Sequence, residues 1–162
     1  MPVIDFTTDV PGRTITITAR FDAPVERIWA LYTDPRQLEQ VWGPPGYPAT
    51  FVEHDVRVGG RSSYYMTGPD GERYGGWWQI TAVDEPHTLE FDDGFADADL
   101  NPTTTMPVSH NVYRFGPDGE GTTLVATSTF ESEEGIRTVV EMGVEEGTRD
   151  AMNQIDGFLA AH

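Results

Sequence analysis

Residues 133–160, EEGIRTVVEMGVEEGTRDAMNQIDGFLA, are the stretch that decides the fold of this chain. Apolar or small residues recur there at helical spacing: Ile136, Val139, Val140, Gly143, Ala151, Met152, Ile155, Phe158 and Leu159. A single helix over this stretch would extend for roughly 40 Å. Nearly everything between Arg13 and Glu131 instead has the pattern of strands and turns. A helix this long must lie along a sheet, and a curved sheet that grips a helix often leaves a cavity between the two.

The residues before this helix predict one curved antiparallel sheet. Alternation of apolar and polar residues over 13–21 predicts a half-buried strand. Asp22-Ala23-Pro24 and Asp34-Pro35 then mark the starts of two short helices, since proline suits the first helical turn. Turn signals such as Gly59-Gly60 divide the remainder into about six further strands, at 50–58, 61–66, 75–83, 88–91, 108–115 and 122–131. The expected fold class is α+β, with six to seven strands wrapped around a long C-terminal helix.

Length and composition limit the classes of function. The 162 residues predict one domain over 13–162, preceded by a lead-in segment over 1–12. No cysteine is present, and no signal peptide is visible, so a cytoplasmic setting is expected. The net charge of -17 argues against nucleic-acid and anionic-membrane partners, because phosphate binding needs clustered Lys and Arg. The acidity serves solubility, or it serves a basic partner protein. A monomer or a homodimer is expected.

The order of elements and motifs resembles the START-like, or SRPBCC, superfamily, which has the helix-grip fold. Within it the chain is most similar to the branch named after the C-terminal domain of the activator of the heat-shock chaperone ATPase. The residues that carry the resemblance span about 13–160: Arg20-Phe21-Asp22-Ala23-Pro24, Val25, Trp29, Thr33-Asp34-Pro35, Trp42-Gly43-Pro44, Asp55-Val56-Arg57-Val58-Gly59-Gly60-Arg61, Met66, Gly68-Pro69-Asp70-Gly71, Pro86, Leu89, Phe91, Gly121-Thr122-Thr123-Leu124, Gly143 and Glu146-Gly147. One departure is Thr148, where the group often has tryptophan; a smaller residue there could enlarge a cavity.

The resemblance implies a cavity fold with several uses. Members bind lipids, hormones or polyketides, some are cyclases or aromatases, and the eponymous branch binds a chaperone. Fold therefore does not settle function.

A ligand-binding set is expected around the cavity between sheet and helix: Trp42, Tyr64, Met66, Trp78, Phe91, His110, Met142, Gly143, Gly147 and Ala151. Gly143 and Gly147 lie four residues apart, and each costs a helix about 1 kcal/mol relative to alanine, so they serve either close packing or a ligand. Adjacent aromatic residues point to opposite faces of a strand. The alternation around Trp78 favours it over Trp77 as the inward ring, whereas Tyr64 and Tyr65 are not separated by pattern alone. Ordinary core packing is the alternative for these aromatic residues.

His110 is the catalytic candidate. It alternates with Val108 and Val112, so we expect it to point inward, where beside a carboxylate it could act as a general acid or base. The alternative is a hydrogen-bonded structural histidine. The histidine spacing predicts no metal site, and no cofactor fingerprint is present.

Two charged segments have structural and functional interpretations. Asp55, Arg57 and Arg61 flank a hairpin and predict exterior ion pairs, with a polar ligand contact as the alternative. The acidic stretch 92–107 is expected to be a long loop that lacks the ligand spacing of a calcium site and could cover a cavity.

The sequence thus favours binding of a small hydrophobic ligand without established catalysis. A polyketide cyclase or aromatase, with His110 and a nearby Tyr or Asp, is the first alternative. A chaperone-regulating or other protein-interaction module is the second; it would show an exposed apolar patch and little internal volume.

Overall fold

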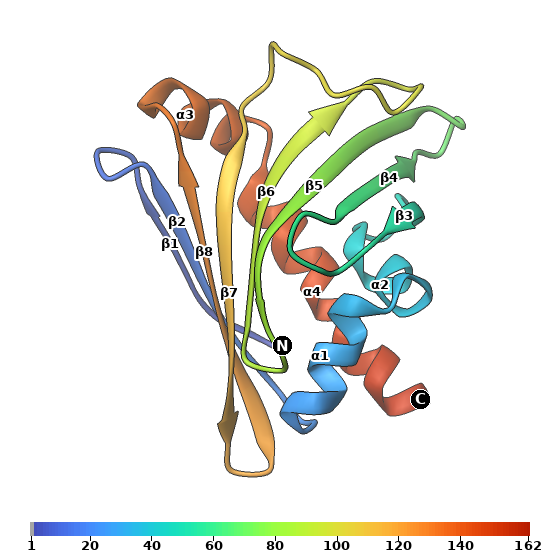
Figure 1. Cartoon of the computed structure of the whole chain (residues 1–162), viewed down its shortest axis with the longest axis vertical. Helices are drawn as coiled ribbons and strands as arrows, with labels where there is room; N and C mark the ends of the chain where they lie inside the picture. The colour runs from blue at the N-terminus through green and yellow to red at the C-terminus, as the bar shows by residue number, and fades with distance from the viewer. Residues whose placement is uncertain (1) are drawn as a thin grey trace.

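A computed structural model of the chain, in which residues 2–162 are described, has one antiparallel sheet of eight strands (Figure 1). The strands are β1 (Val3–Asp9), β2 (Thr14–Phe21), β3 (Ala49–His54), β4 (Arg61–Thr67), β5 (Arg73–Asp84), β6 (Thr88–Ala96), β7 (Ser109–Asp118) and β8 (Gly121–Phe130). Their order across the sheet is β1-β2-β8-β7-β6-β5-β4-β3. β2, which corresponds to the strand expected at 13–21, pairs with β8 along its whole length.

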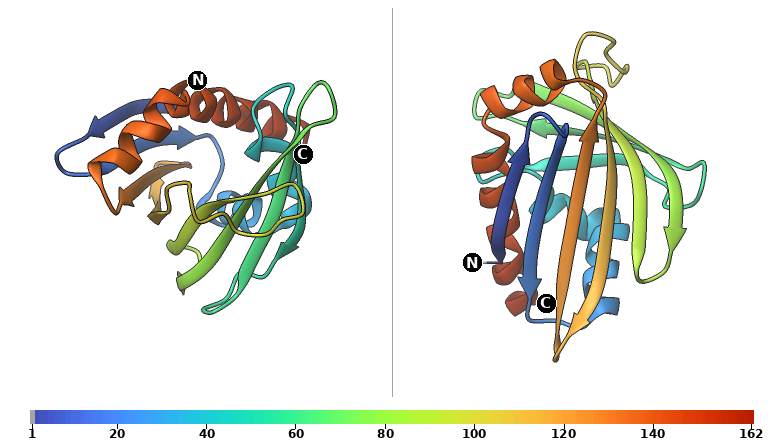
Figure 2. Two further views of the ribbon diagram at one scale, coloured as in Figure 1. Left: turned by 90° about the horizontal axis from the view of Figure 1, so that it is seen from above. Right: turned by 90° about the vertical axis from the view of Figure 1, so that its left-hand side faces the viewer.

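Four helices complete the α+β fold: α1 (Val25–Thr33), α2 (Pro35–Trp42), α3 (Glu133–Glu141) and α4 (Val144–Ala161). The sheet curves, and α4 runs along its open side between the β1 end and the β3 end (Figures 1 and 2). This is the predicted helix-grip arrangement, with eight strands instead of six to seven. None of the helices described is long and apolar enough to cross a membrane.

The additional strand comes from the segment expected to be a lead-in. β1 pairs with β2 from Val3↔Ala19 to Asp9↔Thr14, so residues 3–9 form the edge of the sheet. Their inward side covers part of the core, since Val3 is buried and Phe6 packs against the core. Pro11-Gly12 lies in the hairpin turn between the two strands, in keeping with the preference of proline and glycine for turns.

The long helical pattern is interrupted at Gly143. That glycine has φ +86°, a left-handed conformation that a residue with a Cβ adopts only at a cost. α3 is capped at its N-terminus by Ser132, whose side chain accepts a hydrogen bond from the backbone N–H of Gly135. The expectation of one continuous helix over 133–160 is therefore wrong; α3 lies over one end of the sheet, and α4 alone runs along it (Figure 2).

The acidic stretch after Phe91 is a strand for its first five residues. β6 continues to Ala96 and pairs with β5 through Gly75↔Ala96, so the loop is restricted to 97–108. This corrects the expectation that residues 92–107 form a loop. Asp92 and Asp93 consequently have a defined register and face opposite sides of the sheet.

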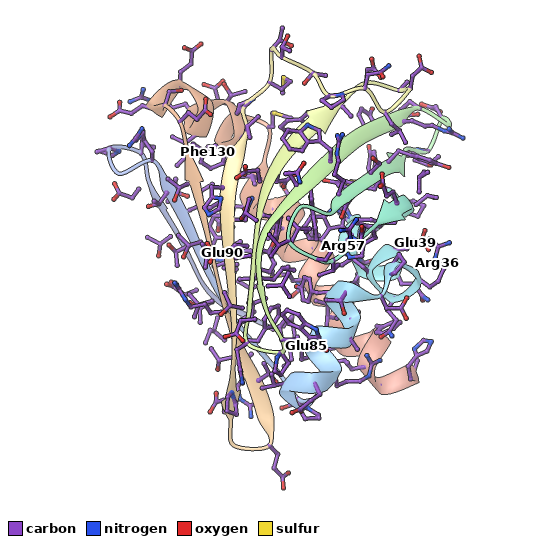
Figure 3. All side chains as sticks on the ribbon, viewed as in Figure 1. Arg36, Glu39, Arg57, Glu85, Glu90 and Phe130 are labelled. Atoms are coloured by element: carbon purple, nitrogen blue, oxygen red, sulfur yellow. The ribbon has the colours of Figure 1, made fainter. Side chains whose placement is uncertain are left out.

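α2 is held against the edge strand β3 by a pair of charged side chains. Arg36 donates to the carbonyl oxygen of Phe51 at 2.7 Å, and the backbone N–H of Phe51 donates to Glu39 at 2.8 Å. Arg36 and Glu39 are also 3.2 Å apart, and Figure 3 shows them on the outer side of α2. These bonds satisfy backbone groups of an edge strand, which would otherwise be open to pairing with another chain.

The apolar core lies where α1 and α2 pack on the concave face of the sheet. Trp78 is fully buried, and its ring stacks on that of Phe91 with centroids 4.0 Å apart. Tyr32 of α1 packs edge-on against Tyr113 of β7 at 5.6 Å. His54 is part of this core: its Nε2 lies 2.9 Å from the carbonyl oxygen of Tyr32 and its Nδ1 lies 2.7 Å from the hydroxyl of Ser62. Burial lowers the His54 pKa, so it is a neutral structural residue.

Candidate ligand-binding site

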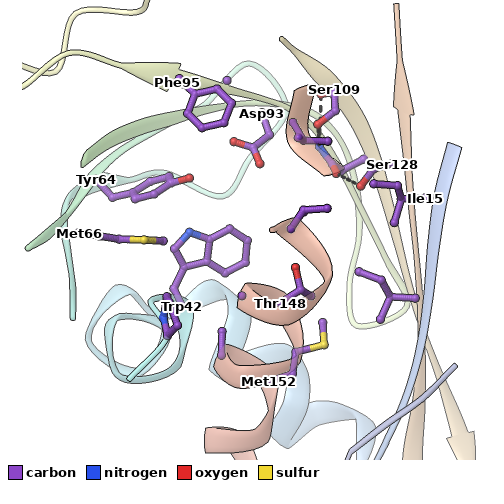
Figure 4. A pocket seen from close by; sticks show the side chains of 18 of the residues that line it. Ile15, Trp42, Tyr64, Met66, Asp93, Phe95, Ser109, Ser128, Thr148 and Met152 are labelled. Carbon is purple, nitrogen blue, oxygen red and sulfur yellow. Dashed lines mark hydrogen bonds between the residues drawn. The ribbon is translucent and has the colours of Figure 1, made fainter. Parts of the chain in front are cut away.

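A cavity of about 360 Å³ lies between the concave face of the sheet and α4. Its volume falls in the range of small-molecule sites. Its wall is mainly apolar, with contributions from the sheet, α2, α3 and α4 (Figure 4). The apolar lining residues include Ile15, Ile17, Val41, Phe95, Pro107, Phe130, Val139, Val144, Met152 and Ile155.

Five of the residues expected to bind a ligand line this cavity: Trp42, Tyr64, Met66, Gly147 and Ala151. Gly147 is informative because a Cβ built on it would meet no atom within 4 Å. Close helix packing therefore does not account for this glycine, and the position faces the open cavity. Thr148, the position at which the related group often has tryptophan, also lines the cavity.

The other five expected residues lie elsewhere. Trp78 and Phe91 are fully buried in the core next to the cavity and do not belong to its lining. Gly143 forms the junction of α3 and α4, and Met142 beside it is 56% exposed. His110 lies on the other side of the sheet, so the expectation that it points inward is wrong.

His110 belongs to a cluster on the convex face. Its Nδ1 lies 2.8 Å from Asp92 and its Nε2 lies 3.3 Å from Glu90, which is labelled in Figure 3. Hydrogen bonding to Asp92, with a further contribution from Glu90, raises the His110 pKa. The alternation of Val108, His110 and Val112 was assigned to the wrong face. The inward face of β7 instead has Ser109, Asn111 and Tyr113, and these polar side chains form one wall of the cavity.

The two members of each adjacent aromatic pair differ in burial. Trp78 and Tyr64 are buried on the concave side, whereas Trp77 and Tyr65 are only partly buried. Trp42 packs edge-on against both, with its ring centroid 5.1 Å from Trp78 and 6.1 Å from Tyr64. The choice of Trp78 as the inward ring is thus correct for its orientation, although Trp78 does not belong to the cavity lining.

Asp93 is the feature of the cavity that the sequence interpretation missed. It lies on β6 with its carboxyl group in the cavity (Figure 4). Burial raises the pKa of Asp93 to about 7. Within residues 2–162 its carboxyl group makes no hydrogen bond or ion pair. The signal that could have found it is its alternation with Phe91 and Phe95, which predicts an inward side chain if the strand continues past residue 91.

Three tyrosines complete this end of the cavity. Tyr32, Tyr64 and Tyr113 all line it, and burial raises the pKa of each well above the ordinary value. Asp93 adds to the effect for Tyr64 and Tyr113, because a negative charge nearby disfavours a phenolate. The indole N–H of Trp42 is buried and has no acceptor within the described part of the chain. This end therefore presents a carboxyl group and several neutral hydroxyl groups.

On the cavity wall beyond this polar end, the polar side chains form hydrogen bonds with one another and with the backbone. The side-chain amide of Asn111 donates to the carbonyl oxygens of Phe91 and Ser109 and to the Ser109 hydroxyl, at 3.2–3.4 Å. Its oxygen accepts from the Ser128 hydroxyl at 2.6 Å. Because these groups bond to one another, they form a polar but neutral surface across from Asp93.

No site for a metal ion is evident: residues 2–162 contain no group of three His, Cys, Asp or Glu side chains that could hold one. The polar groups of the cavity are thus a carboxyl group, hydroxyl groups, an indole N–H and an amide. They can donate or accept hydrogen bonds and, through Asp93, accept or give up a proton near neutral pH.

The fold and cavity define a helix-grip protein of the START-like superfamily. The chain belongs to the family of Activator of Hsp90 ATPase homolog 1-like proteins, whose model matches residues 22–160. The resemblance derived from the motifs is thereby confirmed. Among curated proteins none matches the chain.

Solved structures agree with this assignment. Protein Ms6760 from Mycobacterium smegmatis is 57% identical, with 99% of each chain covered and a TM-score of 0.92. A protein from Arthrobacter aurescens is 48% identical over 99% of this chain and 93% of its own, with a TM-score of 0.93. A protein described as AHSA1 from Silicibacter pomeroyi is 22% identical over 91% of this chain and 98% of its own, with a TM-score of 0.73, and shows the shared fold.

Proposed function

We propose that this protein binds a small, mainly apolar molecule in the cavity between α4 and the sheet. The observation that carries the proposal is the cavity of about 360 Å³, with an apolar wall and a few polar groups at one end. Such a distribution is typical of ligand sites, in which apolar contact supplies affinity and a few polar groups fix the orientation.

The alternatives are less well supported. Acid–base catalysis by His110 is disfavoured because this side chain lies on the convex face and pairs with Asp92 and Glu90. A protein-interaction module was expected to have little internal volume, which the cavity disfavours. The family name alone does not carry a chaperone partner over to this chain.

Gly147 offers a direct test of the cavity. A leucine at this position would project into open space between α4 and the sheet. Gly157 is a matched control, because it lies in the same helix, is exposed, and has nothing within 4 Å of a built Cβ. Both substitutions replace a helical glycine, which should stabilise the helix by up to about 1 kcal/mol.

The experiment is a thermal-shift and tryptophan-quenching screen of the wild-type protein, Gly147→Leu and Gly157→Leu against apolar and amphiphilic small molecules. A ligand at 100 times its Kd adds about 2.7 kcal/mol of stability. We expect the response of the wild-type protein to persist in Gly157→Leu and to be lost in Gly147→Leu. An equal response in all three proteins would show that binding occurs outside the cavity and would refute the proposal.

A further inference from the structure

The polar end of the cavity contains one acid and no base. Asp93 projects between Tyr64 and the wall that has Ser109 (Figure 4). No Lys, Arg or His belongs to the lining among residues 2–162. The unpaired carboxyl group of Asp93 thus faces a cavity in which the protein supplies no positive charge.

Among residues 2–162 no basic side chain of the chain lines the cavity beside Asp93. The chain contains no lysine, and all ten of its Lys and Arg residues are arginines. Several of these pair with carboxylates on the surface, such as Arg57 with Asp55 at 2.7 Å, and Arg149 with Glu145 at 3.0 Å. Asp93 is half-buried in this cavity and its carboxylate has no partner, so a cation from outside the chain would offset the loss of hydration that the charge suffers there.

The neighbours of Asp93 are compatible with a cation. Trp42, Tyr64, Phe95 and Tyr113 line the cavity with aromatic rings, whose faces attract positive charge. The net charge of -17 makes the field around the protein favourable to cations and unfavourable to anions. An anionic ligand such as a fatty acid would instead place a second carboxylate next to Asp93.

Resting on the proposed function, we propose that the cavity selects hydrophobic cations, that is, protonated amines whose ammonium group pairs with the Asp93 carboxylate while their apolar part occupies the space between α4 and the sheet. A neutral molecule of the same shape can fill the apolar part but gains no ion pair. The distinction between the two ligand types therefore depends on Asp93 alone.

Three probes of one shape separate the possibilities: 2-(2-naphthyl)ethylamine, 2-(2-naphthyl)ethanol and 2-naphthylacetic acid. Their affinities are measured by calorimetry for the wild-type protein, Asp93→Asn and Asp92→Asn. Asp92 is the matched control, because it is the next residue on β6 and faces the convex side, and its loss changes the net charge equally. Any effect of long-range charge alone is then common to both variants.

We expect the amine to bind the wild-type protein and Asp92→Asn about tenfold or more tightly than the alcohol does, as for one charge-assisted hydrogen bond. Asp93→Asn should abolish this preference and retain the affinity for the alcohol. The acid should bind most weakly. Retained alcohol binding also shows that the variant is folded with its cavity intact.

The pH dependence supplies a second measurement. The other titratable groups facing the cavity are Tyr32 (α1), Tyr64 (β4), Tyr74 (β5) and Tyr113 (β7), and their pKa values are all raised, so they remain neutral between pH 5.5 and about 8.5. α2 and α4 contribute no titratable group to the lining. The amine affinity of the wild-type protein should rise with pH over this range, with proton release on binding at pH 7, and that of Asp93→Asn should not.

The outcomes distinguish the two proposals. If amine and alcohol bind the wild-type protein equally well, selection of cations is refuted and binding of small apolar molecules stands. If the amine preference persists in Asp93→Asn, the ion pair lies elsewhere and the inference is wrong. If none of the three probes binds and no member of the wider screen responds to Gly147→Leu, both proposals are overturned.

Discussion

Asp93 on β6 is the direct cross-strand partner of Trp78 on β5. This register places both side chains on the concave face, with the indole ring in the core and the carboxyl group at the margin of the cavity. The next pair, Gln79 and Asp92, faces the convex side. If β6 were shifted by one residue, Asp92 would face the cavity and Asp93 the convex side.

In the ligand-free protein, Asp93→Asn should increase the free energy of unfolding above neutral pH. The ordinary pKa of 3.8 applies in the unfolded chain, and burial raises it to about 7 in the folded protein. The folded state therefore binds more protons than the unfolded state between these values, and the free energy of unfolding falls as pH rises. The full effect is on the order of 2–4 kcal/mol.

Urea unfolding of the wild-type protein and Asp93→Asn at pH 4, 6 and 8 measures this effect. The difference between the two proteins should be small at pH 4, grow as pH rises towards 7, and level off above it. A difference that is constant across the three pH values would show that Asp93 ionises normally in the folded protein.

Ser128→Ala should destabilise the protein by about 1–3 kcal/mol, because it leaves the side-chain oxygen of buried Asn111 without a donor. Thr129→Ala is the control on the same strand, since Thr129 is exposed and its loss should change stability by less than about 0.5 kcal/mol. Chemical denaturation of both variants measures the comparison. Equal effects would mean that the hydroxyl–amide bond contributes no specific stabilisation.

The order of elements could be predicted from local signals. Asp34-Pro35 starts α2, with the Asp34 side chain accepting from the N–H of Arg36 at 2.9 Å, and turn residues separate the strands. These signals depend on a few neighbouring residues, so they are visible in the sequence. The edge strand β1 was missed because its register depends on β2 and not on a pattern of its own.

Only part of the candidate site could be predicted from the sequence, because the direction of a side chain on a strand depends on which face of the sheet is buried. Gly147 and Tyr64 were identified because a helical glycine and an aromatic pair need an explanation wherever they occur. Asp93 was overlooked because aspartate is disfavoured in strands, so the acidic run suggested a loop. His110 was misplaced because valines usually indicate the buried face, whereas the inward positions of β7 have polar residues that line a cavity.

His110 should titrate above the ordinary histidine value. The raised pKa means that its pairing with Asp92 and Glu90 contributes stability fully below pH 6.5, and that this contribution is lost as pH rises through the folded-state pKa. Because the His110 side chain is 43% exposed, the effect on stability should be small. NMR titration of the imidazole is the more sensitive measurement.

Asp92→Asn should lower the pKa of His110, because it removes the larger of the two contributions. Asp93→Asn should leave that pKa nearly unchanged, since Asp93 lies on the other face of the sheet. An equal shift in both variants would indicate that net charge, and not the direct hydrogen bond, sets the titration.

Gly143→Ala should destabilise the protein by about 1–2 kcal/mol, because φ at this position is +86° and a Cβ is unfavourable there. Gly157→Ala should have the opposite effect and stabilise α4 by about 0.5–1 kcal/mol, because Gly157 lies within a regular helix.

The junction of α3 and α4 at Gly143 also affects the cavity, since Val139 precedes it on α3 and Val144 follows it on α4, and both line the wall. Gly143→Ala should therefore weaken ligand binding as well as stability, whereas Gly157→Ala should change stability alone. Urea unfolding together with calorimetric titration of a cavity ligand measures both effects; a Gly143→Ala protein as stable as the wild type would mean that the helices can join without the left-handed residue.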